Sequence, residues 1–503
     1  MKKLVSLLLV AVMMFAVMAT ASAELLGPGN VTLKRLGYTC PWDVNADYMV
    51  PIMKEATGYD VEYFALPAEK ADDKLFSEVS GGADYDVVNM GVNQWRTLLA
   101  NGALLPLTDL LNEYGKDILA GNTEEVWNAL KGDDGKIYGV PYMFPHSQEI
   151  NSFLVCRKDL LDKAGITELP ETISEFYNML KQLKEFYGDE YIILTGPLVS
   201  ASEGIVGSWR LPRCITSAFG IFSDWMIDDE GKVIYQTEHP KFAEMIEFFN
   251  KLHNEGLIDS EWAANKETDI QEKFVSGRAI IVTGSRALVN FTTAPMLDNG
   301  VIATIDDLCY INPLHGDDGT CKFMESEGFN QISAVLKNSK HPEDAINWIN
   351  KKVQEQLFIC IGVEGVHFNY DENGQIAPIN PIFANERGDS YYYIDCTNAA
   401  DYQFQWPSRI RKSAGQWHAF SATTLALEDT SIIAKNFLKF MPASEAYANS
   451  NATLFNMLQD FIMQAMDGVR TVNDIPALEK ELANEDLEDV RAELQAYYDG
   501  LAK

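Results

Sequence analysis

Strand and helix patterns alternate along the first hundred residues of this chain. The predicted strands are residues 31–38, 59–66 and 85–90, and the predicted helices between and after them are residues 48–56, 69–79 and 94–100. This βαβαβ alternation predicts an α/β fold with a largely parallel, doubly wound sheet that helices cover.

Open sheets of this kind bind ligands beyond the C-terminal ends of their strands. The rule indicates residues 39–45 after the first strand and residues 91–95 after the third. Each loop contains a tryptophan, Trp42 or Trp95. Packing in the core is the alternative role for both side chains.

Other local patterns extend the alternation along the chain. Residues 173–186 and 341–353 are predicted helices, the first capped by the residues after Pro170, and residues 476–501 are predicted to be helical and acidic. Three Gly-containing acidic clusters, at 133–136, 229–232 and 371–374, predict tight turns. None of them has the ligand spacing of a calcium-binding loop.

Length and charge limit the class of protein. A chain of 503 residues with 47% hydrophobic side chains has enough apolar material for two large lobes or about three domains. The formal net charge is −33. Nucleic-acid binding needs clustered Lys and Arg, so no nucleic-acid partner is expected.

The N-terminus carries the pattern of a secretory signal. Lys2 and Lys3 precede an apolar run over residues 4–17, and Ala21 and Ala23 supply small side chains for a signal peptidase. Cleavage after Ala23 would take the formal charge from −33 to −35. An uncleaved anchor is the alternative. No cysteine lies near the site, so the sequence predicts no lipid attachment there. The signal itself predicts a location in the periplasm or at the cell surface.

Export permits disulfides, but the cysteines do not form an obvious framework. Their number is odd and their spacing wide, which favours mostly buried thiols; a Cys309–Cys321 bond is the alternative left open. There is no C-x-x-C motif and the seven histidines are scattered, so neither a metal site nor a cofactor is predicted.

Catalytic motifs are missing from the sequence, whereas aromatic side chains are frequent. Neither G-x-S-x-G, H-E-x-x-H, a P-loop nor G-x-G-x-x-G occurs. Tryptophans stand in Gly- or Pro-containing segments at Trp209, Trp406 and Trp417. Aromatic faces stack on sugar rings while planar polar groups bind their hydroxyls, so carbohydrate binding is the favoured chemistry. A secreted glycoside hydrolase or lyase with paired carboxylates is the alternative.

Several segments, taken in order, resemble the extracellular solute-binding proteins of ABC importers, in the sugar-binding family that includes maltodextrin-binding proteins. The most similar is DGKIYGVPY at 134–142. The others are ATGYDVE at 56–62, GGADYDVV at 81–88, NGALLPLTD at 101–109, RKDLLDKAG at 157–165, PETISEF at 170–176, FVSGRA at 274–279 and HPEDA at 341–345. The segments at 362–365 and 487–498 resemble the longer subgroup assigned to complex oligosaccharides, including aldouronates.

The resemblance implies a two-lobed periplasmic-binding-protein fold of type II, with a mainly parallel sheet flanked by helices in each lobe and a hinge between the lobes. It implies that residues 24–143 and 281–335 form lobe 1 and residues 144–280 and 336–503 form lobe 2. It also implies a monomer that captures an oligosaccharide by closure and delivers it to the transmembrane subunits of an ABC permease. A peptide ligand and delivery to a membrane sensor remain alternatives.

Ligand contacts follow from the resemblance only where segments match. Arg286 stands where relatives often have an aromatic residue, so its guanidinium could pair with a ligand carboxylate. His146 has a structural role as its alternative. The full set of predicted ligand-binding residues is Trp42, Asn93, Gln94, Trp95, Tyr142, His146, Trp209, Arg210, Arg286, Glu364 and Trp417.

Overall fold

The computed structural model describes residues 25–145, 148–196, 211–326, 328–442 and 444–501. The predicted signal peptide and the predicted contacts His146, Trp209 and Arg210 lie outside the described residues. The chain forms two compact units. Unit 1 comprises Met1–Met143, Asn330–Val363 and Pro381–Asp401, and unit 2 comprises Phe144–Phe329, Glu364–Asn380 and Tyr402–Lys503.

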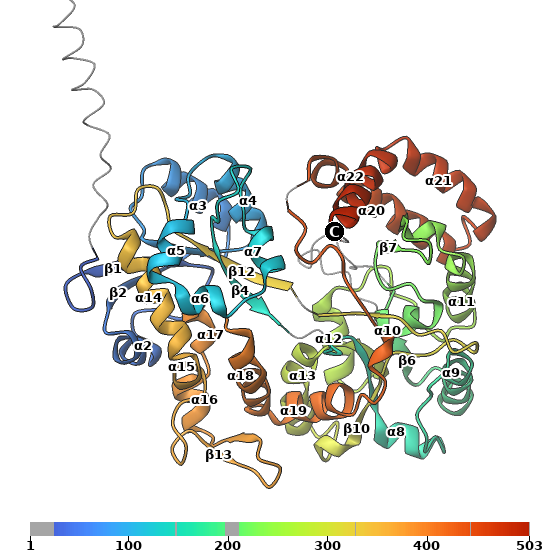
Figure 1. The fold of residues 1–503 in the computed structure, drawn as a ribbon. Coiled ribbons are helices and arrows are strands. Elements are labelled where there is room, and N and C mark those ends of the chain that lie inside the picture. The colour runs from blue at the N-terminus through green and yellow to red at the C-terminus, as the bar shows by residue number, and fades with distance from the viewer. Residues whose placement is uncertain (1–24, 146–147, 197–210, 327, 443, 502–503) are drawn as a thin grey trace, which may run out of the picture. The chain divides into compact units, whose positions relative to one another are not determined.

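Unit 1 is built on a five-stranded sheet in the order β2-β1-β3-β12-β4 (Figure 1). Its strands are β1 (Thr32–Gly37), β2 (Asp60–Ala65), β3 (Val87–Met90), β4 (Val140–Phe144) and β12 (Gly328–Ala334). The first three strands pair in parallel, as the sequence alternation predicts. β12 joins them antiparallel to β3.

The four helices that the sequence predicts in unit 1, α2, α3, α4 and α14, begin and end within about two residues of the predicted positions. The first, α2, ends at Gly58, whose φ of 76° lies in the left-handed region that glycine adopts without strain. The helices are α2 (Met49–Thr57), α3 (Ala71–Ser80), α4 (Val92–Ala100), α5 (Thr108–Tyr114), α6 (Lys116–Ala120), α7 (Glu124–Ala129), α14 (Pro342–Gln354), α15 (Gln356–Cys360), α16 (Ile382–Arg387) and α17 (Ser390–Tyr393). α14 packs against α2, α5 and α6.

Unit 2 contains a four-stranded sheet in the order β10-β5-β9-β6. Its strands are β5 (Phe153–Arg157), β6 (Ile192–Thr195), β9 (Ala279–Gly284) and β10 (Leu308–Ile311). β6 and β9 are parallel, whereas β5 is antiparallel to both β9 and β10. Three two-stranded ribbons accompany it: β7 (Trp225–Ile227) with β8 (Val233–Tyr235), β11 (Phe323–Met324) with β15 (Ile433–Ala434), and β13 (Phe368–Tyr370) with β14 (Ile376–Pro378).

Helices cover both faces of the second sheet. The helices of unit 2 are α8 (Lys158–Lys163), α9 (Ile173–Tyr187), α10 (Arg213–Thr216), α11 (Phe242–Asn254), α12 (Glu267–Val275), α13 (Arg286–Asp298), α19 (Ala414–Phe420), α20 (Glu445–Met466), α21 (Ile475–Ala483) and α22 (Leu487–Leu501); α18 (Ala399–Arg411) begins in the last segment of unit 1. α9 is capped by the residues after Pro170, as predicted, and the structure shows a capping box between Thr172 and Glu175. Within the described chain, no helix combines the length and the apolar character needed to cross a membrane.

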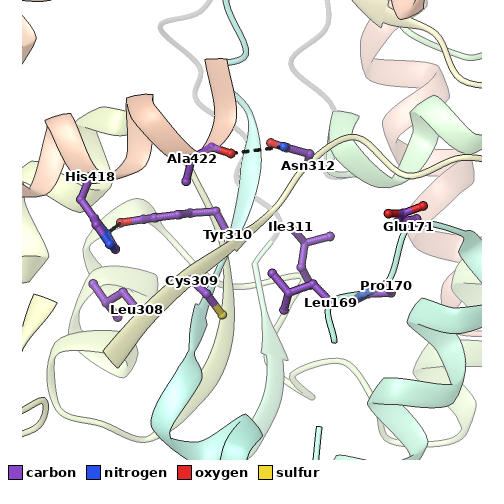
Figure 2. A pocket seen from close by; sticks show the side chains of 10 residues that line it. All are labelled: Leu169, Pro170, Glu171, Leu308, Cys309, Tyr310, Ile311, Asn312, His418 and Ala422. Carbon is purple, nitrogen blue, oxygen red and sulfur yellow. Dashed lines mark hydrogen bonds between the residues drawn. The ribbon is translucent and has the colours of Figure 1, made fainter. Parts of the chain in front are cut away.

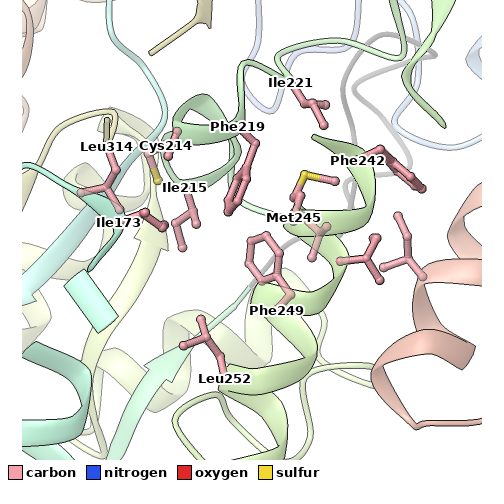
Figure 3. Close-up of a cluster of buried hydrophobic side chains, with 14 of the residues drawn as sticks. Ile173, Cys214, Ile215, Phe219, Ile221, Phe242, Met245, Phe249, Leu252 and Leu314 are labelled. Carbon is pink, nitrogen blue, oxygen red and sulfur yellow. The ribbon is translucent and has the colours of Figure 1, made fainter. Parts of the chain in front are cut away.

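The core of unit 2 follows from the alternation of side chains along its strands. Leu154 and Cys156 of β5 face one apolar cluster, and Phe153 and Val155 face another on the opposite side of the sheet. The first cluster continues into α9, α10, α11, α20 and the C-terminal helices, and Figure 3 shows the part around Phe249 and Met245.

Two sequence-based expectations differ from the structure. Residues 281–329 belong to unit 2 rather than to lobe 1, because β9 and β10 pair with β5 in the second sheet. Residues 336–363 and 381–401 belong to unit 1, because the chain returns to the first sheet at β12. The seven cysteines are free thiols, and Cys309 lies opposite Cys156 in the β10–β5 pair rather than bonded to Cys321.

Candidate ligand-binding site

Unit 2 contains a cavity of about 360 Å³ whose wall combines aromatic, hydroxyl and carboxylate side chains. This volume lies within the roughly 300–1,000 Å³ that is typical of small-molecule pockets. We call it the Trp406 cavity, and its lining residues are Pro145, Gln148, Glu149, Trp406, Phe420, Thr424, Leu425, Leu427 and Thr430.

Trp406 of α18 supplies an indole ring to the cavity wall. The ring stacks on Tyr402, one turn earlier, with centroids 5.8 Å apart and planes at 16°. Phe144 packs against it from another side at 5.8 Å. Trp406 is nevertheless half-buried rather than enclosed. A fixed, partly exposed aromatic face next to polar groups is suited to stacking on the C–H face of a sugar ring.

A buried ion pair between Glu149 and Arg286 lies at the same wall. The two residues are 3% and 7% exposed. The guanidinium carbon of Arg286 lies 5.5 Å from the Trp406 ring centroid and 5.8 Å from that of Phe420. Burial lowers the pKa of Arg286 to about 10, so the side chain stays charged at neutral pH. Its Nη1 atom has no hydrogen-bond partner within the described part of the chain.

The strand-to-helix turn between β9 and α13 positions Arg286. Gly284 ends the strand where a Cβ atom would approach Val155 and Leu288 to 2.8 and 2.9 Å, so a larger residue would displace the turn. Ser285 caps α13 by accepting a hydrogen bond from the backbone N–H of Leu288. Arg286 is therefore held at the first position of the helix.

Helix α19 brings Phe420 to Arg286 because it packs closely on α13. At the contact, a Cβ on Gly415 would lie 2.9 Å from Thr293 Oγ1, so only glycine permits this approach. The helix then widens into a π-helical turn, Ser421–Leu425, which carries two of the lining residues. Such turns are frequent at functional sites.

A second cavity, of about 410 Å³, lies beside β10 in the same unit (Figure 2). Tyr310 Oη and His418 Nδ1 hydrogen-bond each other at 3.0 Å, and Asn312 donates to the carbonyl of Ala422 at 3.4 Å. Burial lowers the pKa of His418 and raises that of Tyr310. The central polar groups of this second cavity bond one another, so they are less available to a ligand. The Trp406 cavity is therefore the stronger candidate for ligand binding.

Unit 1 has a buried charge network near the exit of β1. Asp395 accepts hydrogen bonds from Arg35 Nε at 3.1 Å and Ser333 Oγ at 3.0 Å, and its other oxygen pairs with Lys352. Burial, together with the charge of Arg35, lowers the pKa of Lys352 to about 7 despite the opposing pull of Asp395. The two cations lower the pKa of Asp395 although burial opposes this. The network fixes the residues after α17 against the sheet.

The predicted contacts in unit 1 fall into two groups. Trp95 is 3% exposed and donates from Nε1 to the Tyr138 carbonyl at 3.1 Å, and Tyr142 is 1% exposed. Both side chains fill the core of unit 1, which leaves no ring face for a ligand. Gln94 binds the backbone N–H of Gly91 and Asp72. Asn93 is exposed.

Trp42 also packs within unit 1, but less completely. It is half-buried, with its ring centroid 6.0 Å from that of Tyr392 and 6.4 Å from that of Tyr391. Its position in the loop after β1 agrees with the strand-exit rule, and part of its surface stays accessible.

The predicted contacts in unit 2 are also divided. Arg286 contacts the cavity wall, but its carboxylate partner is Glu149 rather than a free site for a ligand acid. Trp417 lies near Phe420 at 5.9 Å and under Arg411 at 4.7 Å, outside the cavity lining. Glu364 is exposed and does not line the cavity.

Sequence reasoning missed most of the cavity wall. Glu149, Phe420 and Thr424 carry no local motif, because they meet only when the segment after β4 folds against the end of α19 and the turn that follows it. The neighbouring residues Trp406 and Pro407 could have indicated the site from sequence. A proline interrupts a helix, so a tryptophan beside it is less typical of a helix that only fills the core.

The chain matches the bacterial extracellular solute-binding protein family over residues 43–351, and it belongs to this family. It is similar to the polygalacturonan/rhamnogalacturonan-binding protein YtcQ of Bacillus subtilis (strain 168), at 24% identity over 65% of this chain and 64% of that protein. It is also similar to the fructooligosaccharide ABC transporter substrate-binding protein FusA of Streptococcus pneumoniae serotype 4, at 22% identity over 44% of this chain and 43% of that protein. The chain spans 63 to 65% of the length of the first three curated relatives.

Solved structures confirm the fold class. The S. pneumoniae substrate-binding protein FusA in complex with kestose superposes with a TM-score of 0.69 at 16% identity, over 94% of this chain and 99% of that one. The chain therefore has the α/β fold of type II periplasmic binding proteins, as its resemblance implied.

Proposed function

We propose that this chain is the extracytoplasmic substrate-binding protein of an ABC importer, and that it captures an oligosaccharide with the Trp406 cavity as part of its binding site. In this proposal the protein is a monomer that binds its ligand without making or breaking a bond. Its signal peptide is cleaved after Ala23, and an ABC permease receives the ligand.

The composition of the cavity wall carries the proposal. A fixed indole stands beside the amide of Gln148, the carboxylate of Glu149 and the hydroxyls of Thr424 and Thr430. An apolar plate surrounded by hydrogen-bonding groups matches a sugar, which presents C–H faces and hydroxyl edges. Family membership supports the extracytoplasmic role, and the names of the relatives support a carbohydrate ligand.

Some of the sequence-predicted contacts remain part of the proposal. Trp42 and Asn93 are at least partly accessible in unit 1, and Trp417 lies close to Phe420 in unit 2. His146, Trp209 and Arg210 stay as predictions from the resemblance. The buried Trp95 and Tyr142 are left out because they have no accessible ring face.

The test is titration of the full mature chain with a panel of oligosaccharides and peptides, followed by tryptophan fluorescence and calorimetry. We expect saturable binding of one carbohydrate class, and recovery of that carbohydrate unchanged in mass after prolonged incubation. Binding of peptides alone would refute the carbohydrate proposal, and release of shortened products would refute the purely binding role.

The variant Trp406→Ala tests whether the Trp406 cavity is the site. Burying an aromatic side chain contributes about 1.5–3 kcal/mol, so affinity should fall at least about tenfold. Phe404→Ala is the matched control, because Phe404 belongs to the same helix, is 51% exposed and does not line the cavity. Equal losses in both variants would assign the ligand to another place.

A further inference from the structure

We infer that the Trp406 cavity accepts an uncharged sugar residue and discriminates against a uronic acid. The inference rests on the proposed function and adds the charge class of the ligand. It departs from the sequence-based expectation that Arg286 would pair with a ligand carboxylate.

Among the described residues, the charges at the cavity are balanced within the protein. Glu149 is the one ionisable side chain among the described residues that line the cavity, and Arg286 is its ion-pair partner. A second cation, Arg409, has its guanidinium carbon 5.9 Å from the Trp406 ring centroid but does not line the cavity. A ligand therefore meets a carboxylate whose counter-charge is engaged.

A uronic acid would bind this wall poorly for two reasons. Its carboxylate would lie close to that of Glu149, and like charges at short range repel. To reach Arg286, the ligand would have to displace Glu149, which is 3% exposed, and leave that carboxylate buried without its cation. Breaking a buried pair in this way is strongly unfavourable.

A neutral sugar avoids both penalties. One of its hydroxyls can donate a hydrogen bond to Glu149, and charge-assisted bonds of this kind are among the stronger ones in proteins. The ion pair thus offers an acceptor to a neutral ligand without separating its charges.

Calorimetry with chemically matched ligands tests the inference. Each neutral oligosaccharide in the panel is compared with a derivative in which the primary alcohol at C6 is oxidised to a carboxylate. We expect the neutral form that binds best to lose affinity at least tenfold on oxidation. Equal or tighter binding of the acidic form overturns the inference but keeps the proposed function, whereas absence of saccharide binding overturns both.

The variant Glu149→Gln gives a second readout. It preserves the shape and hydrogen-bonding capacity of the side chain but leaves Arg286 as an unpaired cation, so the discrimination against the acidic ligand should shrink tenfold or reverse. Glu272→Gln is the matched control, because it removes the carboxylate from an exposed Arg–Glu pair with Arg278. An unchanged ratio in Glu149→Gln overturns the inference, and the wild-type ratio alone decides if that variant does not fold.

Discussion

Replacing Asp395 by Asn tests how the charge network of unit 1 stabilises the fold. The carboxylate is fully buried between two cations, and it is the acceptor for Arg35, Ser333 and Lys352. Asn has the same shape but no charge, so Arg35 would remain as a buried cation without a counter-ion. Lys352 would lose its proton, since burial already lowers its pKa to about 7.

The magnitude follows from the loss of the single anion. Removing one partner from a buried ion pair costs about 3–5 kcal/mol, and a guanidinium remains charged at any accessible pH. Loss of the neutral hydrogen bond in Ser333→Ala should cost only about 1 kcal/mol. Lys352→Met leaves one cation with one anion, so its effect should be small or even stabilising.

The assay combines urea unfolding with hydrogen exchange of peptides from β1 and β12, which locates the effect in unit 1. For Asp395→Asn we expect a free energy of unfolding lower by about 3–5 kcal/mol and faster exchange in both strands. A loss below about 1 kcal/mol, or a larger loss in Lys352→Met than in Asp395→Asn, would refute the view that the anion compensates two cations.

Three further outcomes can be measured. The lowered pKa of Lys352 means that the unfolded chain binds more protons between about pH 7 and 10.5, so stability should rise with pH across this window, and Lys352→Met should flatten the rise seen in unfolding curves. A disulfide oxidant should join Cys156 to Cys309, which lie opposite in paired strands, with a mass loss of about two hydrogens that Cys309→Ser abolishes. Gly415→Val should clash with Thr293, lower stability by about 1–3 kcal/mol and weaken ligand binding in the same titration.

The elements near the N-terminus were predictable because each carries its own boundary signal. Gly58 ends one helix, and the residues after Pro170 cap another, as expected from local chemistry alone. The division into units could be predicted only in part from the sequence. A strand such as β9 has no local mark that tells which sheet it joins, and the return to the first sheet at β12 depends on pairing with β3.

The candidate site was less predictable than the fold. A tryptophan after a strand has the same local sequence whether it fills the core, as Trp95 does, or stays half-buried, as Trp42 does. The pairing of Arg286 with Glu149 joins residues that lie 137 positions apart, and no local pattern encodes it. Residues of this kind are recognised only once the tertiary packing is known.

The link between Arg35 and Asp395 has a consequence for biosynthesis. The two residues are 360 positions apart, so at about 5–20 residues per second the arginine emerges from the ribosome roughly 20–70 s before its carboxylate. During that time the buried position of Arg35 in β1 lacks its counter-ion, so burying the guanidinium would be unfavourable. Folding of the N-terminal sheet before Asp395 has emerged is thereby disfavoured, so this part of the nascent chain should stay open to chaperones until then.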